Sequence, residues 1–505
     1  TITVLPVDDA PVLDLDASGP GTGFSSTYTE NGAGVPIADT DVLIQDVDNT
    51  ALASATVTIT NGQAGDLLTA AGLPAGIGAS YDAGSFTLTL SGQASLANYQ
   101  AALAAVRFAS TSENPPTLPR IVAVSVNDGL LGSAAAQATV NVVAVNDAPV
   151  NGLPASFAAS EDTALALTGL SVADVDAAGG ALSLTLSVGA GTGSLSAGAS
   201  GRVTVTGSGT ASLTLTGALP ALNAYLASAA APVFTPAANL NGAVALTLTT
   251  SDNGNTGAGG ALTDVDTTLI TLAPVNDAPV NTLPASFTTN EDTPLALTGL
   301  AVSDVDAGTG ALTLSVGAGS GSLSATASGG VTVAGSGTAS LTLTGTLPAL
   351  NAYLASAAPV FTPVADANGA VTLTMTTNDG GNTGTGTPLT DTDTSTIVIA
   401  PVADIAGDTA STPEDTPVTL AVLANDSFEN PGRTITAVNG AAISPGGAAV
   451  AVANGSVRLN ADGTLTYAPS ADYTGATSFT YTVTAGGVTE TATVAVTVTP
   501  VNDAP

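Results

Sequence analysis

The chain has 505 residues, of which 40 are acidic and five basic, so its formal net charge is −35. All five basic residues are Arg, and Cys and His are absent, which excludes disulfides, Cys or His zinc sites, and nucleophile–base pairs built on His, Cys or Lys. The charge disfavours nucleic acid and anionic lipid as partners and favours divalent cations. With 44% hydrophobic residues the chain has material for cores, and no stretch has the pattern of a membrane span.

One motif divides the chain into repeats. Val-Asn-Asp-Ala-Pro occurs at 145–149, 275–279 and 501–505, with variants at 7–11 and 401–404. Each copy follows a β-branched run and most end in a Pro that cannot donate to a sheet ladder, which is typical of a linker. The linkers predict the end strand of a preceding repeat with its linker, three repeats and a shorter fourth repeat, at 1–12, 13–149, 150–279, 280–403 and 404–505. Because the chain opens on an end strand and closes on a linker, we expect it to be part of a longer array.

Aliphatic residues alternate with Thr or Ser through most of the chain. Clear examples are 55–60 and 86–90 in the first repeat, and 182–188 and 213–216 in the second. This period of two predicts antiparallel strands with one buried face. Short strands broken by Gly and Asn at regular spacing predict an all-β fold of tandem sandwiches.

A short segment with helical spacing of its apolar residues interrupts the strand pattern once in each of three repeats. Residues 219–226 carry Pro220 near their start and apolar residues at helical spacing, so we expect one or two helical turns. Residues 347–354 are a near copy, and 96–103 are the counterpart in the first repeat. The fourth repeat lacks this segment and is expected to consist of short hairpins.

Three acidic signals recur in the same order in the repeats. A Glu ends the opening strand, an Asp-x-Asp pair follows, and an Asp stands beside Gly late in the repeat. Alternate residues of an extended strand share a face, so Asp-x-Asp directs two carboxylates to one point. Oxygen ligands of this kind suit Ca²⁺. The Glu residues are Glu30, Glu161, Glu291 and Glu414; the pairs are Asp46/Asp48, Asp174/Asp176 and Asp304/Asp306; the late residues are Asp128, Asp252 and Asp379.

Each of these acids also has a simpler interpretation. An Asp next to Gly is commonly a turn residue, and for Asp128 alone we favour the turn. Because the acids recur at the same positions in three repeats, we favour metal ligands as the interpretation of the whole set. The pairs Asp264/Asp266 and Asp391/Asp393 stand before the final strand of their repeats, and for them ligand and loop residue remain open.

The order of these motifs resembles that of cadherin repeats. The Glu-Asp-Thr-Pro-Leu opening at 291–295 and the Val-Asn-Asp-Ala-Pro closing are similar to the cadherin-like repeats of very large bacterial RTX-type adhesins. The resemblance covers nearly the whole chain. It implies an all-β, elongated array of Ig-like or cadherin-like Greek-key β-sandwiches, with Ca²⁺ bound at the junctions between repeats.

The resemblance also implies ligand sets, in which the earlier repeat gives its Glu, the linker gives Asn and Asp, and the later repeat gives its other acids. The first-to-second junction would use Glu30, Asn146, Asp147, Asp174, Asp176 and Asp252. The second-to-third would use Glu161, Asn276, Asp277, Asp304, Asp306 and Asp379. The amino-terminal junction would use Asp9, Asp46, Asp48 and Asp128. At the third-to-fourth junction Asp404 lacks a preceding Asn, and Asn425-Asp426 and Ala485-Gly486 replace the acids, so we expect a weak site or none, and a hinge.

These features predict a non-enzymatic extracellular protein, and the resemblance implies the surface of a Gram-negative bacterium that secretes it. The acid pairs repeat at domain edges and only 3% of residues are aromatic, which disfavours a glycosidase. We expect the stalk of an adhesin in cell adhesion or biofilm, whose partners are neighbouring repeats. The alternative is a subunit of an extracellular fibre, sheath or surface layer that assembles laterally or end to end, because Thr-rich faces without Lys leave strand edges unguarded. Without Lys, Lys–Asn isopeptide bonds are excluded as a means of stiffening.

Overall fold

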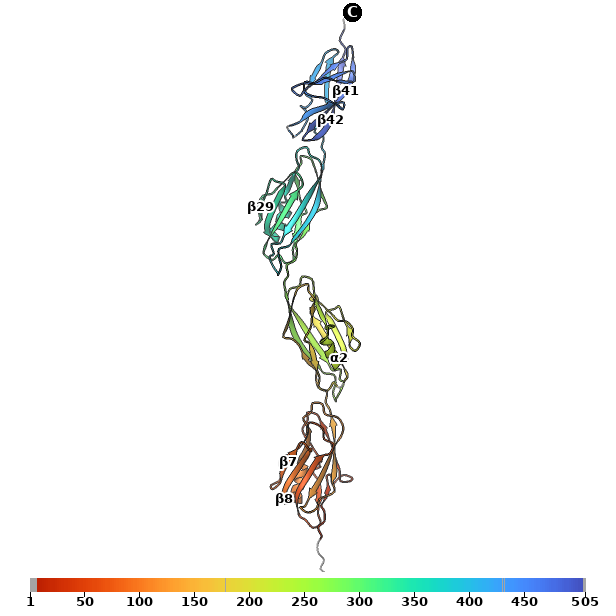
Figure 1. Cartoon of the computed structure of the whole chain (residues 1–505), viewed down its shortest axis with the longest axis vertical. Helices are drawn as coiled ribbons and strands as arrows, with labels where there is room; N and C mark the ends of the chain where they lie inside the picture. The colour runs from red at the N-terminus through yellow and green to blue at the C-terminus, as the bar shows by residue number, and fades with distance from the viewer. Residues whose placement is uncertain (1–6, 178, 429, 431, 503–505) are drawn as a thin grey trace, which may run out of the picture. The chain divides into compact units, whose positions relative to one another are not determined.

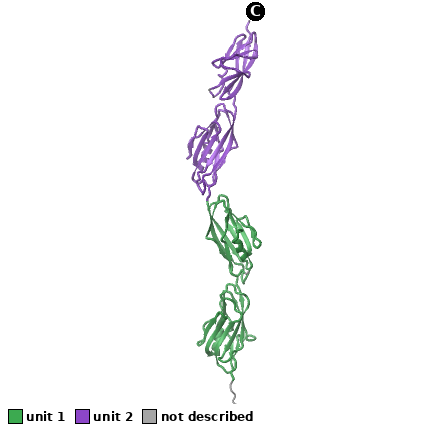
Figure 2. Ribbon diagram, viewed as in Figure 1, with its two compact units in different colours: residues 1–273 green, residues 274–505 purple. Residues whose placement is uncertain are grey.

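The computed structural model describes residues 7–177, 179–428, 430 and 432–502. The strand expected within 1–6 and the linker residue Asp503 lie outside the described residues. The chain divides into two compact units, 1–273 and 274–505 (Figure 2). Figure 1 labels the elements along the chain.

The first unit begins with a sandwich whose larger sheet has six strands, among them the labelled neighbours β7 and β8 (Figure 1). In spatial order the six are β2 (Phe24–Thr29), β11 (Ala136–Val143), β10 (Arg120–Asn127), β5 (Ala51–Ile59), β8 (Thr87–Ser95) and β7 (Gly78–Asp82). The smaller sheets are β3 (Val35–Pro36), β9 (Val106–Ser110) and β6 (Asp66–Ala70), and the pair β1 (Val12–Asp14) and β4 (Leu43–Gln45). Helix α1 (Leu96–Ala104) follows β8.

The second sandwich of this unit repeats the same order of strands. Its large sheet is β13 (Ser156–Ser160), β22 (Thr263–Ala273), β21 (Gly242–Ser251), β16 (Ala181–Val188), β19 (Ser212–Ala218) and β18 (Thr204–Thr206). Its small sheets are β14 (Leu165–Ala166), β20 (Val233–Pro236) and β17 (Gly193–Ser196), and the pair β12 (Val150–Gly152) and β15 (Ser171–Ala173). Helix α2 (Leu219–Leu226) takes the place of α1.

The second unit opens with a third sandwich of this kind. Its large sheet is β24 (Ser286–Asn290), β33 (Thr390–Ala400), β32 (Gly369–Asn378), β27 (Ala311–Ala318), β30 (Ser340–Thr346) and β29 (Thr332–Ala334). Its small sheets are β25 (Leu295–Ala296), β31 (Val360–Thr362) and β28 (Ser322–Ser324), and the pair β23 (Val280–Thr282) and β26 (Ala301–Ser303). Helix α3 spans Leu347–Ser356.

The fourth sandwich is shorter and differs in its strand order. One sheet is β34 (Asp408–Pro413), β42 (Val488–Thr499), β41 (Gly475–Ala485), β36 (Thr434–Val438) and β37 (Ala441–Ala442). The other is β35 (Val418–Leu420), β40 (Leu465–Pro469), β39 (Gly455–Leu459) and β38 (Val450–Val452). No helix occurs among its described residues, as the missing Pro-led segment predicted.

Alternation along the strands accounts for the cores. In β5, Val57 and Ile59 are buried, while the hydroxyl of the intervening Thr58 lies 3.0 Å from that of Thr87 on the outer face of β8. Each sandwich has its own buried cluster that draws residues from both of its sheets, for example Leu68 of β6 against the β5 side chains. The predicted all-β class, the alternating strands and the short helices are therefore confirmed.

The first and last long strands of each sandwich pair in parallel. β2 pairs with β11, and the register aligns Thr29 with Val143, the final residues of the two strands. The same pairing joins β13 to β22, β24 to β33, and β34 to β42. Because parallel strands end at the same edge of a sheet, the Glu after the first strand lies beside the linker that leaves the last strand. This topology therefore places an acid of each sandwich beside its linker.

Candidate metal centre at the linkers

Glu30 fastens the first linker to the sandwich that precedes it. Its N–H donates to the carbonyl of Val143 at 2.9 Å, and its Oε2 accepts the N–H of Val145 at 2.7 Å. The residue is only 3% exposed, and its Oε1 has no hydrogen-bond partner. One carboxylate oxygen therefore holds the linker, and the other is buried and available to a ligand.

A ligand oxygen of Glu30 lies within 4.8 Å of one from Glu113 and one from Asp147, and we call these three residues the Asp147 cluster. Two oxygens on one Ca²⁺ at about 2.3–2.6 Å can be separated by no more than about 5 Å. The Oδ2 of Asp147 is also buried without a hydrogen-bond partner. The spacing and the all-oxygen donor set fit a hard divalent cation.

The charges in the Asp147 cluster raise two pKa values. Burial and the nearby carboxylates of Asp147, Glu113 and Asp176 raise the pKa of Glu30, although the N–H of Val145 opposes the shift. Burial, Asp176 and Glu113 raise the pKa of Asp147. Both shifts mean that burial and the neighbouring carboxylates disfavour the ionised groups when no cation balances them.

Glu113 was not among the predicted ligands. It lies in the loop 111–119 between β9 and β10. It stands alone there and does not belong to a repeated acidic motif such as Asp-x-Asp, so no sequence pattern gave a reason to select it. Asn31 Nδ2 donates to its Oε2 at 3.2 Å. In the same loop, Asn114 Nδ2 donates to the carbonyl of Val175, between the two aspartates of the second repeat, at 3.0 Å. The loop thus contacts both the linker acids and the following sandwich.

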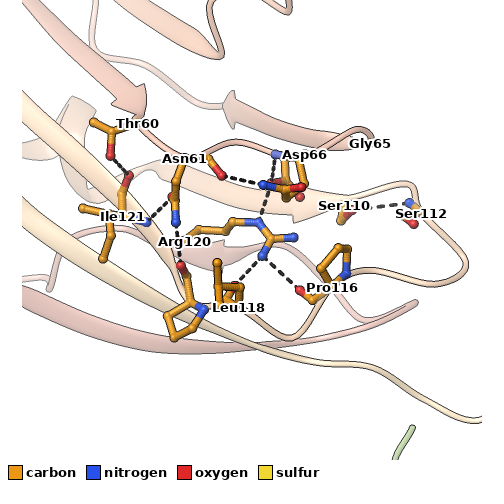
Figure 3. A network of polar contacts seen from close by, with 12 residues as sticks. Thr60, Asn61, Gly65, Asp66, Ser110, Ser112, Pro116, Leu118, Arg120 and Ile121 are labelled. Carbon is orange, nitrogen blue, oxygen red and sulfur yellow. Dashed lines mark hydrogen bonds and ion pairs between the residues drawn. The ribbon is translucent and has the colours of Figure 1, made fainter. Parts of the chain in front are cut away.

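A buried ion pair anchors this loop (Figure 3). Arg120 Nε lies 2.6 Å from Asp66 Oδ2, and both side chains are fully buried. Arg120 Nη1 donates to the carbonyls of Pro116, at 2.9 Å, and of Leu118. Asn61 holds the next residues, since it donates to the carbonyl of Pro119 at 2.9 Å and accepts the N–H of Ile121. Arg120 therefore positions the loop without contacting the Asp147 cluster.

The Asp-x-Asp pair of the second repeat joins the linker through backbone hydrogen bonds. The N–H of Asp147 donates to Asp176 Oδ2 at 3.2 Å, and the N–H of Asp176 donates to Asp174 Oδ1 at 3.1 Å. Burial and Asp176 raise the pKa of Asp174 to about 6. Helix α2 supports β15, the strand just before this pair. The side chain of Asn223 on α2 accepts the N–H of Val172 on β15 at 3.0 Å and donates to the carbonyl of Val172 at 2.8 Å.

Asn146 and Asp252 pair directly. Asn146 Nδ2 donates to Asp252 Oδ2 at 2.6 Å, and both residues are buried. The other oxygen, Oδ1, accepts the N–H groups of Gly254 and Leu262 at 2.7 and 2.9 Å. Asp252 thus has the turn role considered for an Asp beside Gly, and its second oxygen holds the linker. Asp252 and the amide of Asn146 therefore fasten the linker, and their role as metal ligands stays a prediction.

The second unit repeats this arrangement at its own linker. Asn276 Nδ2 donates to Asp379 Oδ2 at 2.6 Å, the N–H of Asp277 donates to Asp306 Oδ2 at 2.9 Å, and the N–H of Asp306 donates to Asp304 Oδ1 at 3.1 Å. Burial and Asp306 raise the pKa of Asp304 to about 6. In the first unit, Glu161 is buried after β13 and accepts a hydrogen bond from Asn241 at 3.2 Å.

The amino-terminal acids form a more exposed version. The N–H of Asp9 donates to Asp48 Oδ2 at 3.2 Å, and the N–H of Asp48 donates to Asp46 Oδ1 at 3.1 Å. Asp8 occupies the place of the linker Asn, and its Oδ1 accepts a hydrogen bond from Asn49 at 2.9 Å. Asp128 Oδ1 accepts the N–H groups of Leu130 and Leu131, a turn arrangement.

The pairs left open between ligand and loop lie in strands. Asp264 is on β22 and Asp391 on β33. Asp264 Oδ2 accepts the N–H of Asn151 at 2.8 Å, and Asp391 Oδ2 accepts that of Asn281 at 2.7 Å. These two carboxylates therefore fasten the short strands β12 and β23 that follow the linkers.

At the third linker the acids that the pattern lacks are replaced by others. Asp404 lies close to Glu291 and Glu490, and also to Asp292 and Asp366; these five residues are called the Asp404 cluster. Sequence reasoning missed Glu490 and Asp366 because neither belongs to a recurring motif. The expectation of a weak site or none rested on the missing Asn, Asp-x-Asp pair and late Asp, and the structure places other acids beside Asp404.

Residues 399–497 match a family model described as a bacterial Ig domain. The parallel pairing of first and last strands recurs in the other three sandwiches. The chain is a tandem array of Ig-like β-sandwiches. No curated protein matches this array. Among the helices described in it, none is long and apolar enough to cross a membrane.

The solved structures similar to the array include cadherin ectodomains. The protocadherin gammaB4 extracellular domain is 13% identical with a TM-score of 0.34, over 99% of this chain and 68% of that chain. The fragment EC22-24 of mouse cadherin-23 is 18% identical with a TM-score of 0.33, over 78% of this chain and all of that chain.

Proposed function

We propose that the chain is part of an extracellular repeat array, with the repeats at 13–149, 150–279, 280–403 and 404–505, in which Ca²⁺ at the linkers holds neighbouring sandwiches together. The observation that carries the proposal is the gathering of Glu30 and Glu113 of one sandwich with Asp147 of its linker, whose N–H donates to Asp176 of the next sandwich. In this role the array would serve as the stalk of an adhesin on a bacterial cell surface.

At the first linker, Glu30, Glu113 and Asp147 would hold the cation together with Asp174 and Asp176 of the next sandwich. A bound Ca²⁺ would supply the positive charge that these carboxylates lack. Glu30 fixes the linker to the first sandwich, and Asp176 fixes it to the second through the N–H of Asp147. At the first linker these contacts would give the junction a defined geometry.

Self-assembly into a fibre, sheath or surface layer is the second candidate. It is favoured by the outer faces of the large sheets, where hydroxyl pairs such as Thr247–Thr267 at 3.2 Å and Thr376–Thr392 at 3.0 Å replace charged side chains. Electron microscopy in calcium distinguishes the two, since a stalk gives separate particles and the alternative gives regular contacts between chains.

Calorimetric titration of the chelator-treated full chain tests the proposal. Extracellular Ca²⁺ modules bind with a Kd of about 10⁻⁴–10⁻³ M, and we expect binding in this range at pH 7.5. Asp174 and Asp304, with pKa values of about 6 against an ordinary 3.8, hold protons in the folded state that the unfolded state lacks. Without calcium, stability should therefore fall as the pH rises from about 4 to about 6.

Protons compete with Ca²⁺ for the same oxygens, so the affinity should rise with pH up to about 6 and then level off. An affinity that is equal at pH 5 and pH 7.5 would show that these carboxylates do not bind the ion. A chain that takes up no calcium at either pH contradicts the proposal as a whole.

A further inference from the structure

The third linker differs in sequence from the others, yet the structure gathers carboxylates around it. Glu291 follows β24, and its Oε1 accepts the N–H of Val402 at 2.5 Å. Asp404 is 7% exposed, and its N–H donates to Oε2 of Glu490 on β42 at 2.8 Å. The N–H of Ile405 donates to the same oxygen at 2.9 Å. The linker is thus held by a Glu from the third sandwich and another from the fourth.

Two acid groups share Asp404. A ligand oxygen of Asp404 lies within 4.8 Å of one from Glu291 and one from Glu490, and the same limit holds for Asp404 with Asp292 and Asp366. The two basic residues of the fourth repeat do not serve this cluster in their hydrogen bonds, because Arg433 and Arg458 donate to the backbone carbonyls of Phe428 and Gly446.

Asp366 is the residue that points to a ligand. Its side chain is 2% exposed, and neither carboxylate oxygen has a hydrogen-bond partner. Its backbone is held in place, since its N–H donates to Asp292 Oδ1 at 3.0 Å. A buried carboxylate costs several kcal/mol unless it is paired or coordinates a metal. An oxygen of Asp366 lies within 4.8 Å of oxygens of Asp292 and Asp404, a separation that ligands of one Ca²⁺ can have.

We propose that the Asp404 cluster is a divalent-cation site in which Glu490 and Asp366 replace the Asn and Asp-x-Asp ligands of the other linkers. The inference rests on the proposed function for the identity of the ion, Ca²⁺. A hinge was expected at this junction. A cation bound by residues of the third sandwich, the linker and the fourth sandwich would instead make the junction rigid, like the others.

Hydrogen exchange of the full chain, followed by mass spectrometry in calcium and in chelator, tests the site. The peptide 401–407 contains the N–H groups of Val402, Asp404 and Ile405 that bond to Glu291 and Glu490, and the peptide 144–150 reports on the first linker. We expect calcium to slow exchange in both. Glu490→Gln and Asp366→Asn should raise the calcium concentration needed at 401–407 by about 10–100-fold, as losses of metal-site residues do. The peptide 144–150 should be unaffected.

Asp462→Asn is the matched control, since it removes one exposed acid of the fourth repeat that lies outside the cluster. Exchange of each variant in chelator establishes that it is folded. If calcium protects 144–150 but not 401–407 in the parent chain, the inference fails and the proposed function stands. If calcium protects neither peptide, both fail. If both variants respond as the parent does, other residues hold the ion and the assignment is wrong.

Discussion

Glu30→Gln should stabilise the first sandwich in chelator and destabilise it in calcium. Without a cation, Glu30 lies buried near Asp147, Glu113 and Asp176, which disfavour its charge, and neutral Gln relieves that repulsion while keeping an acceptor for Val145. With calcium, the variant loses a ligand. A 10–100-fold loss of affinity at saturating calcium corresponds to about 1.4–2.7 kcal/mol. Native-state hydrogen exchange of β10 and β11 gives the free energy of unfolding in chelator and in calcium, and so measures both effects.

The control for this inversion is Asp82→Asn. Asp82 is an exposed acid of the same repeat, and hydrogen bonds from Ser85 and Gly84 lower its pKa. Its replacement removes the same charge and a turn contact, so any effect should have the same sign and size in calcium and in chelator. An effect of Glu30→Gln that is also independent of calcium would show that Glu30 only fastens the linker.

Arg120→Met should have the largest effect on stability of any single substitution in the first repeat. It leaves the carboxylate of Asp66 buried without its partner and frees the carbonyls of Pro116 and Leu118. Removing one member of a buried ion pair costs about 3–5 kcal/mol. Hydrogen exchange of β10 in calcium measures this loss. Because Arg120 also holds the loop of Glu113, the variant should need more calcium to protect the peptide 144–150.

The double variant Arg120→Met, Asp66→Asn separates the two roles of the ion pair. It removes both buried charges, so its cost should be smaller than the sum of the two single costs. Its loop still lacks the Arg120 hydrogen bonds, so the calcium requirement should stay raised. A loss below about 1 kcal/mol for Arg120→Met would contradict the account of this pair.

Much of the fold could be predicted because the sequence pattern of its elements is periodic. Alternation predicted strands such as β5 and β16, and Pro220 with its apolar spacing predicted α2. The recurring acids were also visible, since Asp174 and Asp176 stand at the same phase as Asp304 and Asp306. What periodicity could not give is the parallel pairing of first and last strands, which brings Glu30 and Val145 together across 115 residues.

The acids that escaped prediction have no such regularity. Glu113 and Asp366 lie in loops after β9 and β31, whose lengths differ between repeats. Glu490 is a single acid near the start of β42, half-buried and on the same face as Ala492 and Val494. Their roles follow from loop anchors distant in sequence, such as Asp66 for the loop of Glu113. A single acid without a repeated neighbour cannot be distinguished from a solvated side chain by sequence alone.

The claim that cations fix one sandwich relative to the next is tested most directly by measuring the distance between two spin labels across the first linker. The chain has no Cys, so Ser80→Cys on β7 and Thr206→Cys on β18, both exposed, give one label on each sandwich of the first unit. Electron–electron double resonance on frozen samples should show a narrow distance distribution in millimolar calcium and a much broader one in EGTA. Distributions of equal width in the two conditions would contradict the account.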